Sequence, residues 1–391
     1  MMTHNIKSLS LLVASSLFAG GAMANEDCGC DFTLPLSHYA FDGAEQGILP
    51  GQTLCLAAGQ RGPMKLVNIH GTKSSPVVVK NCGGVMETTP FHYAMTIQQS
   101  RHVKLSGTGD ADYHYGIRLG GTLGIERLSS DIEVNNVEIY QADFAGIMAK
   151  TDPTCESDTQ AGNFTLENLN IHHNWIHNTQ RGEGMYLGYT GLYRTLVCDG
   201  TEQKVYPHDL QGLRVQHNVV HNSAAEGIQA NSLTRDTVIS DNQVSLYGQD
   251  PFAAYQNNGI QIGGDQVLLA NNVIDTGSGN GVIAIGKDIR IENNTIVNAG
   301  SYGIFADNRP GEGTQMGQAG LPHQYINNTI IDSGEEGIRS YVRLTDGANV
   351  VRGNVMINDG SPNQYGAARF IHYLNNDVLR EEENNHHIVR D

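Results

Sequence analysis

Residues 259–304 read GIQIGGDQVLLANNVIDTGSGNGVIAIGKDIRIENNTIVNAGSYGI, and one pattern occurs in them three times. A glycine followed by an aliphatic residue recurs every 22 residues, at Gly259, Gly281 and Gly303. An Asn-Asn pair ends nine residues before each of the last two glycines. Between these marks apolar and polar residues alternate, which is the periodicity of β-strands. So regular an interval indicates a repeat built from strands.

Strands that repeat at this interval and stack in register form a parallel β-helix, in which each turn lies about 4.8 Å above the last. We therefore predict an all-β, right-handed parallel β-helix solenoid, with the hand that parallel strand connections generally take. Equivalent positions form columns, and amides in one column can each donate to one neighbour and accept from the other. The asparagines predicted to form this internal ladder are Asn136, Asn174, Asn218, Asn242, Asn272, Asn294, Asn328 and Asn354.

The chain divides into three segments. Residues 1–24 combine Lys7, a short apolar run and an A-x-A ending at Ala24, which is typical of a secretory signal peptide. We expect a secreted or periplasmic protein after cleavage near Ala24. Residues 25–360 are predicted to form the β-helix with a cystine-rich N-terminal cap, and residues 361–391 a C-terminal cap and tail. No apolar run reaches the length of a membrane span, so we expect no integral membrane segment.

Six cysteines follow the expected cleavage site, and an even number in an exported chain predicts disulfides. Cys155 and Cys198 lie in two polar insertions, and we predict that they form a bond. The remaining four allow three pairings, which the sequence leaves open: Cys28, Cys30, Cys55 and Cys82. A metal site is the less favoured interpretation, because the zinc-finger spacing of cysteines and histidines is missing.

The composition is that of a globular protein, with 39% hydrophobic residues and a net charge of −17. This charge argues against nucleic acid as a partner, since nucleic-acid binding depends on neutralising phosphates with lysine and arginine. A polyanionic ligand would need a local basic patch or a bound cation.

The repeated Asn-Asn-x-Ile and Gly-Ile frame, over roughly residues 45–360, resembles the right-handed parallel β-helix, or pectate-lyase-like, superfamily of secreted bacterial carbohydrate-active proteins. The run from Pro50 to Leu56 also resembles the first turns of alginate-lyase and chondroitinase-B relatives. The superfamily includes lyases, hydrolases, epimerases and non-catalytic surface proteins, so the resemblance implies the fold more strongly than the activity. Residues 182–188 are similar in shape to a catalytic-face strand of those relatives, but Tyr186 replaces their basic residue. Their catalytic lysine and arginine are therefore not transferred to this chain.

Strand alternation places the residue after each inward aliphatic side chain on the outer surface. The predicted outward column is Arg118, Met148, Tyr186, Gln229, Gln261, Ile283, Phe305 and Arg339. A second column, one step before the glycines, is Ala145, Glu183, Glu226, Asn258, Asn280, Tyr302 and Glu336. A third column aligns His177, His221 and Asp275. Titratable residues gather on three successive turns beside two long insertions, 151–162 and 189–210, which favours a functional site there.

Glu183 and Glu226 form the sharpest pair, since carboxylates on adjacent turns would lie about 5 Å apart. Like charges this close raise the pKa of one carboxyl group, as a general acid requires, and the separation resembles that in a retaining glycosidase. The same pair, together with Asn258, offers oxygen ligands for Ca²⁺. The alternative is two solvated glutamates in turns of an acidic protein.

Uronate β-elimination needs a cation that neutralises the substrate carboxylate, a base that removes the C5 proton and an acid for the leaving oxygen. Lys150 or Arg181 is expected to neutralise the carboxylate. His208, His177 or Tyr186 is expected to act as base or acid. The expected substrate-binding residues are Arg118, Gln229, Gln261, Asn258 and Tyr189.

These patterns favour a polysaccharide-active enzyme, and the resemblance favours a lyase that cleaves a uronate-containing glycan. A glycoside hydrolase that uses Glu183 and Glu226 fits the residues equally well. The third alternative is a non-catalytic carbohydrate-binding or surface-structural β-helix. We expect a polysaccharide as partner, a monomer, and no cofactor unless calcium occupies the glutamate pair.

Overall fold

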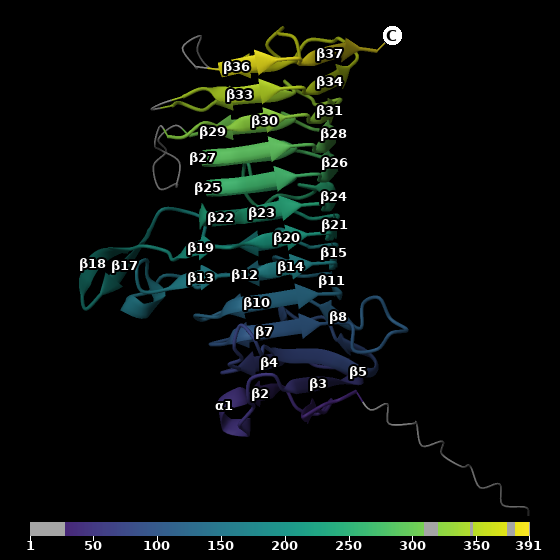
Figure 1. Cartoon of the computed structure of the whole chain (residues 1–391), viewed down its shortest axis with the longest axis vertical. Helices are drawn as coiled ribbons and strands as arrows, with labels where there is room; N and C mark the ends of the chain where they lie inside the picture. The colour runs from purple at the N-terminus through teal and green to yellow at the C-terminus, as the bar shows by residue number, and fades with distance from the viewer. Residues whose placement is uncertain (1–27, 309–319, 345–346, 374–379, 391) are drawn as a thin grey trace, which may run out of the picture.

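The computed structural model describes residues 28–308, 320–344, 347–373 and 380–390. The expected signal peptide, residues 1–24, lies outside the described residues. Within them 35 strands form one continuous sheet, which winds into a single coil whose turns stack along the long axis of the molecule (Figure 1). Strands of successive turns pair in parallel, as the 22-residue period predicts. The predicted β-helix is confirmed.

The coil has three faces, and each full turn adds one strand to each face. Face A consists of β2 (Ala40–Asp42), β4 (Met64–Val67), β6 (Tyr93–Gln98), β9 (Thr122–Glu126), β12 (Ile147–Ala149), β16 (Met185–Leu187), β22 (Ile228–Arg235), β25 (Ile260–Ala270), β27 (Val282–Glu292), β29 (Ile304–Asp307), β32 (Ile338–Tyr341) and β35 (Ile371–Tyr373). The long strands β25 and β27 continue round the corner into face B.

Face B consists of β1 (Phe32–Leu34), β3 (Thr53–Arg61), β5 (Val77–Thr88), β7 (Arg101–Ser106), β10 (Ser130–Asn135), β14 (Asn170–His172), β20 (Arg214–Gln216), β23 (Thr237–Ser240), β30 (Gln324–Ile326), β33 (Asn349–Arg352) and β36 (Arg380–Glu383). Face C begins with the ends of β3 and β5. It continues with β8 (Ile117–Gly120), β11 (Val137–Tyr140), β15 (Trp175–His177), β21 (Val219–His221), β24 (Gln243–Tyr247), β26 (Val273–Gly277), β28 (Thr295–Ala299), β31 (Thr329–Ile331), β34 (Val355–Asn358) and β37 (His386–Val389).

The other elements lie outside these three faces. Strands β13 (Thr165–Glu167) and β19 (Asp209–Gln211) pair with each other at the corner between faces A and B. Strands β17 (Arg194–Cys198) and β18 (Thr201–Val205) form a separate antiparallel hairpin, which projects from the side of the coil (Figure 1). A four-residue helix, α1 (Gly43–Gln46), lies at the N-terminal end, and a 3-10 turn, η1 (Ser157–Thr159), lies in the first insertion.

The glycine-aliphatic repeat is explained by the packing inside face A. The aliphatic residues form one fully buried column: Ile147, Met185, Ile228, Ile260, Val282, Ile304 and Ile338. A Cβ atom on Gly259 would lie 2.5 Å from Gly281 O and 2.5 Å from Ile274 Cγ2. No side chain fits at such a distance, so glycine recurs at this point of each turn.

The asparagine ladder lies at the corner between faces B and C. The Asn272 side-chain nitrogen donates to Asn294 Oδ1 at 2.9 Å and also to Ile239 O at 3.0 Å. The Asn272 backbone N–H donates to the same Asn294 Oδ1 at 2.9 Å. Ladder amides are buried in the same arrangement from Asn174 to Asn354. The predicted internal ladder is thus confirmed for all but its first member.

Asn136 does not belong to the ladder. It has a φ of 53°, and Val137 occupies the ladder position, where its N–H donates to Asn174 Oδ1. Left-handed backbone belongs to the residue before each ladder position, such as Asn271 with a φ of 57°, rather than to the ladder residue itself. The ladder also extends by one member, because Asn354 donates to Asn385 Oδ1 at 3.0 Å.

The coil continues beyond residue 360, where the sequence predicts a cap and tail. Strands β35, β36 and β37 pair in parallel with β32, β33 and β34 and so complete one more turn. The irregular spacing of glycines after residue 360 hides this turn in the sequence, although its Asn384-Asn385 pair is present.

Three disulfides join the described cysteines, and none of these is free. The predicted bond between Cys155 and Cys198 is present, and it ties the first insertion to β17 of the hairpin. The pairings left open are Cys28–Cys82 and Cys30–Cys55, which fasten the first described residues to β5 and β3. Disulfides of this number are usual in oxidising compartments. Within the described residues, no helix is long and apolar enough to cross a membrane.

The ladder makes a prediction about stability. Asn272→Ala should lower the free energy of unfolding by about 1–3 kcal/mol, because it leaves buried partners on the neighbouring turns without hydrogen bonds. Gln243→Ala removes an exposed amide on the preceding turn and should have little effect. Urea denaturation followed by circular dichroism measures both variants. Equal midpoints for the two would contradict the structural role of the ladder.

Candidate functional site

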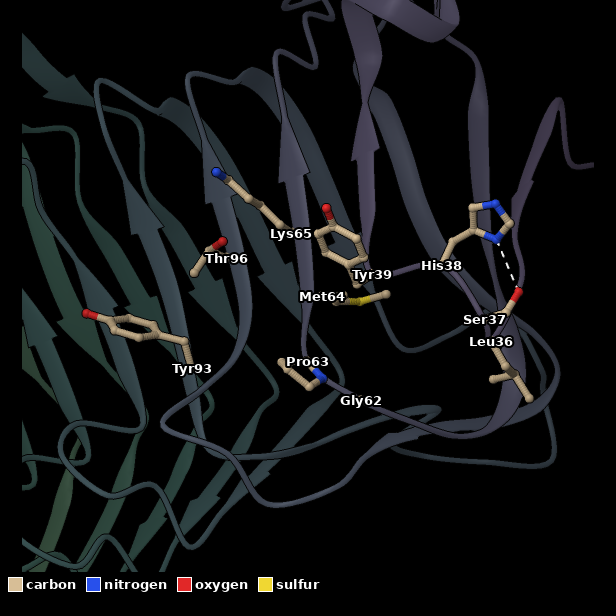
Figure 2. Close-up of a pocket in the computed structure, with 10 residues that line it drawn as sticks. All are labelled: Leu36, Ser37, His38, Tyr39, Gly62, Pro63, Met64, Lys65, Tyr93 and Thr96. Carbon is tan, nitrogen blue, oxygen red and sulfur yellow. Dashed lines mark hydrogen bonds between the residues drawn. The ribbon is translucent and has the colours of Figure 1, made fainter.

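A groove runs along the N-terminal half of face A, and three hollows make it up. Their volumes are about 410, 490 and 480 Å³, and Tyr93 lines all three. Register places Lys65, Thr96, Gly124 and Met148 in one outward column along the floor, each on the next strand. The hollow around Lys65 is drawn in Figure 2. The column therefore positions successive side chains at the spacing of the strands.

The predicted outward column is confirmed from Met148 onward. Met148 lies beside Tyr186, and Tyr186 beside Gln229, in the register of neighbouring strands. The continuation to Gln261 and beyond follows the same register. The pre-glycine column is also present, as the bonds from Gly146 N–H to the Glu183 carbonyl and from Gly184 N–H to the Glu226 carbonyl show.

Lys150 is the central cation of the groove and lines two of its hollows. Its side chain is 15% exposed and forms an ion pair with Asp152 at 2.5 Å. The Lys150 ammonium lies 5.0 Å from the ring centroid of Tyr186 and 5.5 Å from that of Tyr189. A cation so close to two aromatic rings is attracted by both. Lys150, Tyr186 and Tyr189, all named from the sequence, therefore do come together.

Thr190 holds Tyr186 in this cluster. Its backbone N–H donates to the Tyr186 phenol oxygen at 3.3 Å. Its hydroxyl accepts hydrogen bonds from the side-chain amides of Gln229 and Asn231, at 2.8 and 2.9 Å. Residues 188–190 thus cross face A as a strap over the Gln229 turn. We call this segment the strap.

Two expected substrate-binding residues are covered by this arrangement. Gln229 is 1% and Gln261 is 6% exposed, and Gln261 donates to Asn231 at 3.4 Å. Both lie in the predicted outward column, but the strap and its partners bury them. They hold the strap and are not available to a ligand.

Tyr93 and Glu126 complete the floor of the groove and were missed by the sequence analysis. Burial and the neighbouring Glu126 carboxylate, which also accepts its hydrogen bond, raise the pKa of Tyr93. A Cβ atom on Gly124 would lie 3.0 Å from both the Tyr93 ring and the Glu126 carboxylate. Glycine at this position therefore lets the two side chains meet. Only the register between β6 and β9 could have revealed the pair.

Glu183 and Glu226 are buried, at 1% and 0% exposure, and line none of the three hollows. One oxygen of each lacks a hydrogen-bond partner among the described residues. Burial raises the pKa of Glu183 to about 7, although nearby Lys150 opposes this shift. Burial, and then the charge of Glu183, raise the pKa of Glu226 well above its ordinary value. The two carboxyl groups are electrostatically coupled, as expected, but both are buried.

The segment from residue 248 to 257 packs against the turns that neighbour these two glutamates. Its backbone is hydrogen-bonded to the turn that precedes Glu226, at residues 223–225. It then runs back along the coil until Phe252 contacts Phe144, with ring centroids 5.6 Å apart. The sequence shows this segment as an insertion but gives no sign that it folds back.

The expected calcium trio is not arranged as a set of ligands. Asn258 directs its side-chain nitrogen, rather than its oxygen, at Glu226, at 3.3 Å. The Asn258 oxygen accepts a hydrogen bond from Asn280 at 2.7 Å. This amide pattern does not fit a cation held jointly by Glu183, Glu226 and Asn258. Asn258 is also fully buried, so it does not face a substrate.

His208 occupies a scaffold position. It is fully buried, and its Nε2 accepts a hydrogen bond from Thr151 N–H at 3.0 Å. Its Nδ1 bonds Asp209 O at 2.9 Å, and its ring packs edge-on against Phe164. Burial lowers the pKa of His208, so a neutral ring with both nitrogens occupied anchors the insertions. The expected role as catalytic base does not fit this environment.

Arg118 and His177 lie on face C, away from the groove. The Arg118 guanidinium donates to both Glu138 oxygens, at 2.7 and 3.1 Å, and His177 Nε2 lies 3.2 Å from the same carboxylate. Arg118 pairs in register with Glu87 and Glu138 rather than with Met148, so the predicted column is wrong at its first member. Its glycine, Gly116, precedes a face C strand.

Arg181 is at the rim of the groove, where it lines the hollow that contains Phe252. Its side chain is 63% exposed and pairs with Asp143 at 2.6 Å, while His92 bonds the same carboxylate at 2.9 Å. Lys150 is the better placed cation, because it is only 15% exposed and lines two of the hollows, whereas Arg181 lines one of them from the rim.

Comparisons with known proteins agree on the architecture. The structure superposes on the A-module of the mannuronan C-5 epimerase AlgE4 from Azotobacter vinelandii, with a TM-score of 0.52, 14% identity, and coverage of 89% of this chain and 88% of that one. It also matches the GH136 lacto-N-biosidase from Eubacterium ramulus, with a TM-score of 0.55 and 13% identity. That match covers 87% of this chain and 63% of the other.

The chain has the right-handed parallel β-helix fold. No protein-family profile matches it, and no curated protein sequence matches it either. At these identities the β-helix neighbours establish the fold and leave the activity to be argued from the groove.

Glu183 makes a prediction about pH. Its folded-state pKa of about 7 exceeds the ordinary value of 4.5, so the folded chain binds the extra proton between these values. The contribution of Glu183 to the free energy of unfolding is fully present below pH 4.5 and decreases as the pH rises toward 7. Glu183→Gln should remove this fall, a relative gain on the order of 3 kcal/mol.

Urea denaturation across this pH range measures the effect. The matched control is Glu156→Gln, an exposed glutamate, and it should follow the native protein at every pH. If Glu183→Gln also runs parallel to the native protein, the buried carboxyl group does not titrate as described.

Proposed function

We propose that this protein is a secreted polysaccharide lyase that cleaves a uronate-containing glycan by β-elimination. The observation that carries the proposal is the placing of Lys150 in an open groove, with its ammonium 5.0 Å from the ring centroid of Tyr186 and 5.5 Å from that of Tyr189. The fold neighbours support a carbohydrate substrate in general terms, since one is a mannuronan epimerase and another a lacto-N-biosidase. Export is supported by the three disulfides.

The role of Lys150 follows from the chemistry of the substrate. The C5 proton of a uronate becomes acidic only when the adjacent carboxylate is neutralised, so that charge can develop on it. Lys150 supplies that positive charge, and its ion pair with Asp152 holds the ammonium toward the groove. In a half-buried site this electrostatic contribution is larger than it would be in water.

Tyr186 is the group that we assign to proton transfer. As a phenolate it takes the C5 proton of the sugar, the C4–C5 double bond forms, and the bond from C4 to the glycosidic oxygen breaks. The phenol then returns the proton to the leaving oxygen, which restores the balance. The assignment is supported by the hydrogen bond that the Tyr186 oxygen accepts from Thr190 N–H at 3.3 Å, and by the Lys150 ammonium 5.0 Å from the Tyr186 ring centroid. Tyr189 provides a ring against which a sugar can stack.

The buried glutamates support a lyase over a hydrolase that uses them. Both carboxyl groups of a glycosidase must reach the scissile bond, one of them to protonate the leaving oxygen. Glu183 and Glu226 are 1% and 0% exposed, whereas Tyr186 is partly exposed.

A hydrolase remains the second candidate for one specific reason. Carboxylates do line the groove, in the hollow next to Lys150: Glu126, Asp152, Glu156 and Asp158. A pair of these could protonate a glycosidic oxygen and activate water. The decisive measurement is therefore the nature of the product rather than the loss of polymer.

Purified protein should be incubated with a panel of acidic and neutral polysaccharides. A lyase produces reducing ends together with the ultraviolet absorbance of an unsaturated uronate. Reducing ends without this absorbance would establish the hydrolase. Retention on a glycan without either signal would establish a binding protein instead.

Two variants test the assignment of residues. Lys150→Met and Tyr186→Phe should each lower turnover at least about a hundredfold, since each removes a group that acts in the transition state. The controls are matched: Lys204 also lies over a tyrosine ring, at 4.1 Å from Tyr193, but on the projecting hairpin. Lys204→Met and Tyr206→Phe should retain full turnover. Equal rates for all four variants would place the reaction elsewhere.

A further inference from the structure

The hollow at the N-terminal end of the groove has an unusual electrostatic character. It is lined by Leu36, Ser37, His38, Tyr39, Gly62, Pro63, Met64, Lys65, Tyr93 and Thr96. This set contains a lysine and a histidine but no aspartate or glutamate, although the protein as a whole carries a net charge of −17. Because its lining carries positive charge and no carboxylate, this hollow favours the binding of an anion even though the protein is acidic.

Lys65 is the charged side chain of this hollow. It is half-buried on β4, and no carboxylate among the described residues lies within ion-pair distance of it. The comparable groove and face lysines are paired, as Lys104 is with Glu133 and Lys150 with Asp152. Figure 2 shows the Lys65 side chain between those of Tyr39 and Thr96, with its amino group extended away from the strand. Its charge is therefore free to meet a ligand.

Arg61, which precedes the lining residue Gly62, adds a second positive charge near the hollow. It is 4% exposed, and one of its nitrogens donates to the carbonyl oxygen of His38, a lining residue. Its Nε and Nη1 atoms have no hydrogen-bond partner among the described residues, and no carboxylate there pairs with it. A buried guanidinium without a counter-charge is costly. An anion held in front of it would offset part of that cost through the intervening backbone.

Aromatic rings border the same hollow. Tyr39 is 76% exposed, and Tyr93 continues from this hollow into the two that contain Lys150. Exposed tyrosine rings present a flat apolar face together with a hydroxyl, which suits the two sides of a sugar ring. Lys65 is three strand spacings from Met148 along the floor, about 14 Å.

We propose that this hollow is a second, distal subsite, in which Lys65 binds an anionic group of the same glycan chain that lies over Lys150. The inference rests on the proposed function, because it takes the ligand to be an acidic polysaccharide. The anionic group is a sugar carboxylate or a sulfate ester, both of which a lysine binds as a point charge. The site thus selects glycans that carry negative charge on several units along the chain.

Affinity electrophoresis in native gels tests this binding without relying on catalysis. The gels contain polygalacturonate, alginate, dextran sulfate or the neutral glucan laminarin. Lys65→Gln should bind the acidic polymer about five- to tenfold more weakly than the native protein, the loss of one charge-assisted contact. Lys73→Gln is the matched control, an exposed lysine of the same region outside the hollow, and should bind as the native protein does.

Further measurements make the test specific. Lys65→Arg should restore binding, and circular dichroism should show the same fold for every variant. In lyase assays, Lys65→Gln should raise KM for the polymer while kcat stays unchanged, because Lys65 is far from the reacting bond. Retardation by dextran sulfate alone would identify the anion as sulfate, and retardation by a polyuronate would identify it as carboxylate.

The outcomes separate the two proposals. Equal binding by Lys65→Gln and Lys73→Gln, or binding of laminarin as strong as that of the acidic polymers, overturns the distal subsite. Lys65-dependent retention on an acidic polymer without any unsaturated product overturns the lyase and leaves the anionic subsite standing.

Discussion

From the turn of Asn174 onward, the hydrogen bonds of the asparagine ladder hold each turn of the coil in register with the next. A ladder amide such as Asn272 bonds the turns on both sides of its own, through side chain and backbone together. The register of paired strands must be kept, because a shift of one residue turns every outward side chain of a strand inward. The alignment of Met148, Tyr186 and Gln229 in one outward column is therefore supported by bonds made at a different corner of the coil.

The groove arises where this regular column is interrupted. Gly124 contributes no side chain, and the Tyr93 ring and the Glu126 carboxylate approach each other across the space it leaves. Lys65 lies in the column toward one end, and Lys150 lies two residues after the column residue Met148. An acidic protein thus presents Lys65 in a hollow whose lining has no carboxylate, which favours an anion locally.

The sequence predicts what depends on the repeat and misses what depends on contacts between distant turns. The columns through Tyr186 and Glu183 follow from a constant spacing and are correct. Arg118 is misplaced because its Gly-Ile pair opens a face C strand, and periodicity alone does not distinguish faces. The packing of residues 248–257 near Glu183 and the scaffold role of His208 depend on insertions that fold back over the coil. Such contacts leave no periodic signal in one sequence.

The strap at residues 188–190 gives the groove two unlike ends. At the Lys65 end the floor lies open, whereas beyond Tyr186 the strap crosses face A and is tied down on Gln229 and Asn231. The floor is therefore open at one end and blocked by the strap at the other. If a sugar chain binds along it as proposed, the strap limits how many sugar units fit beyond Tyr186.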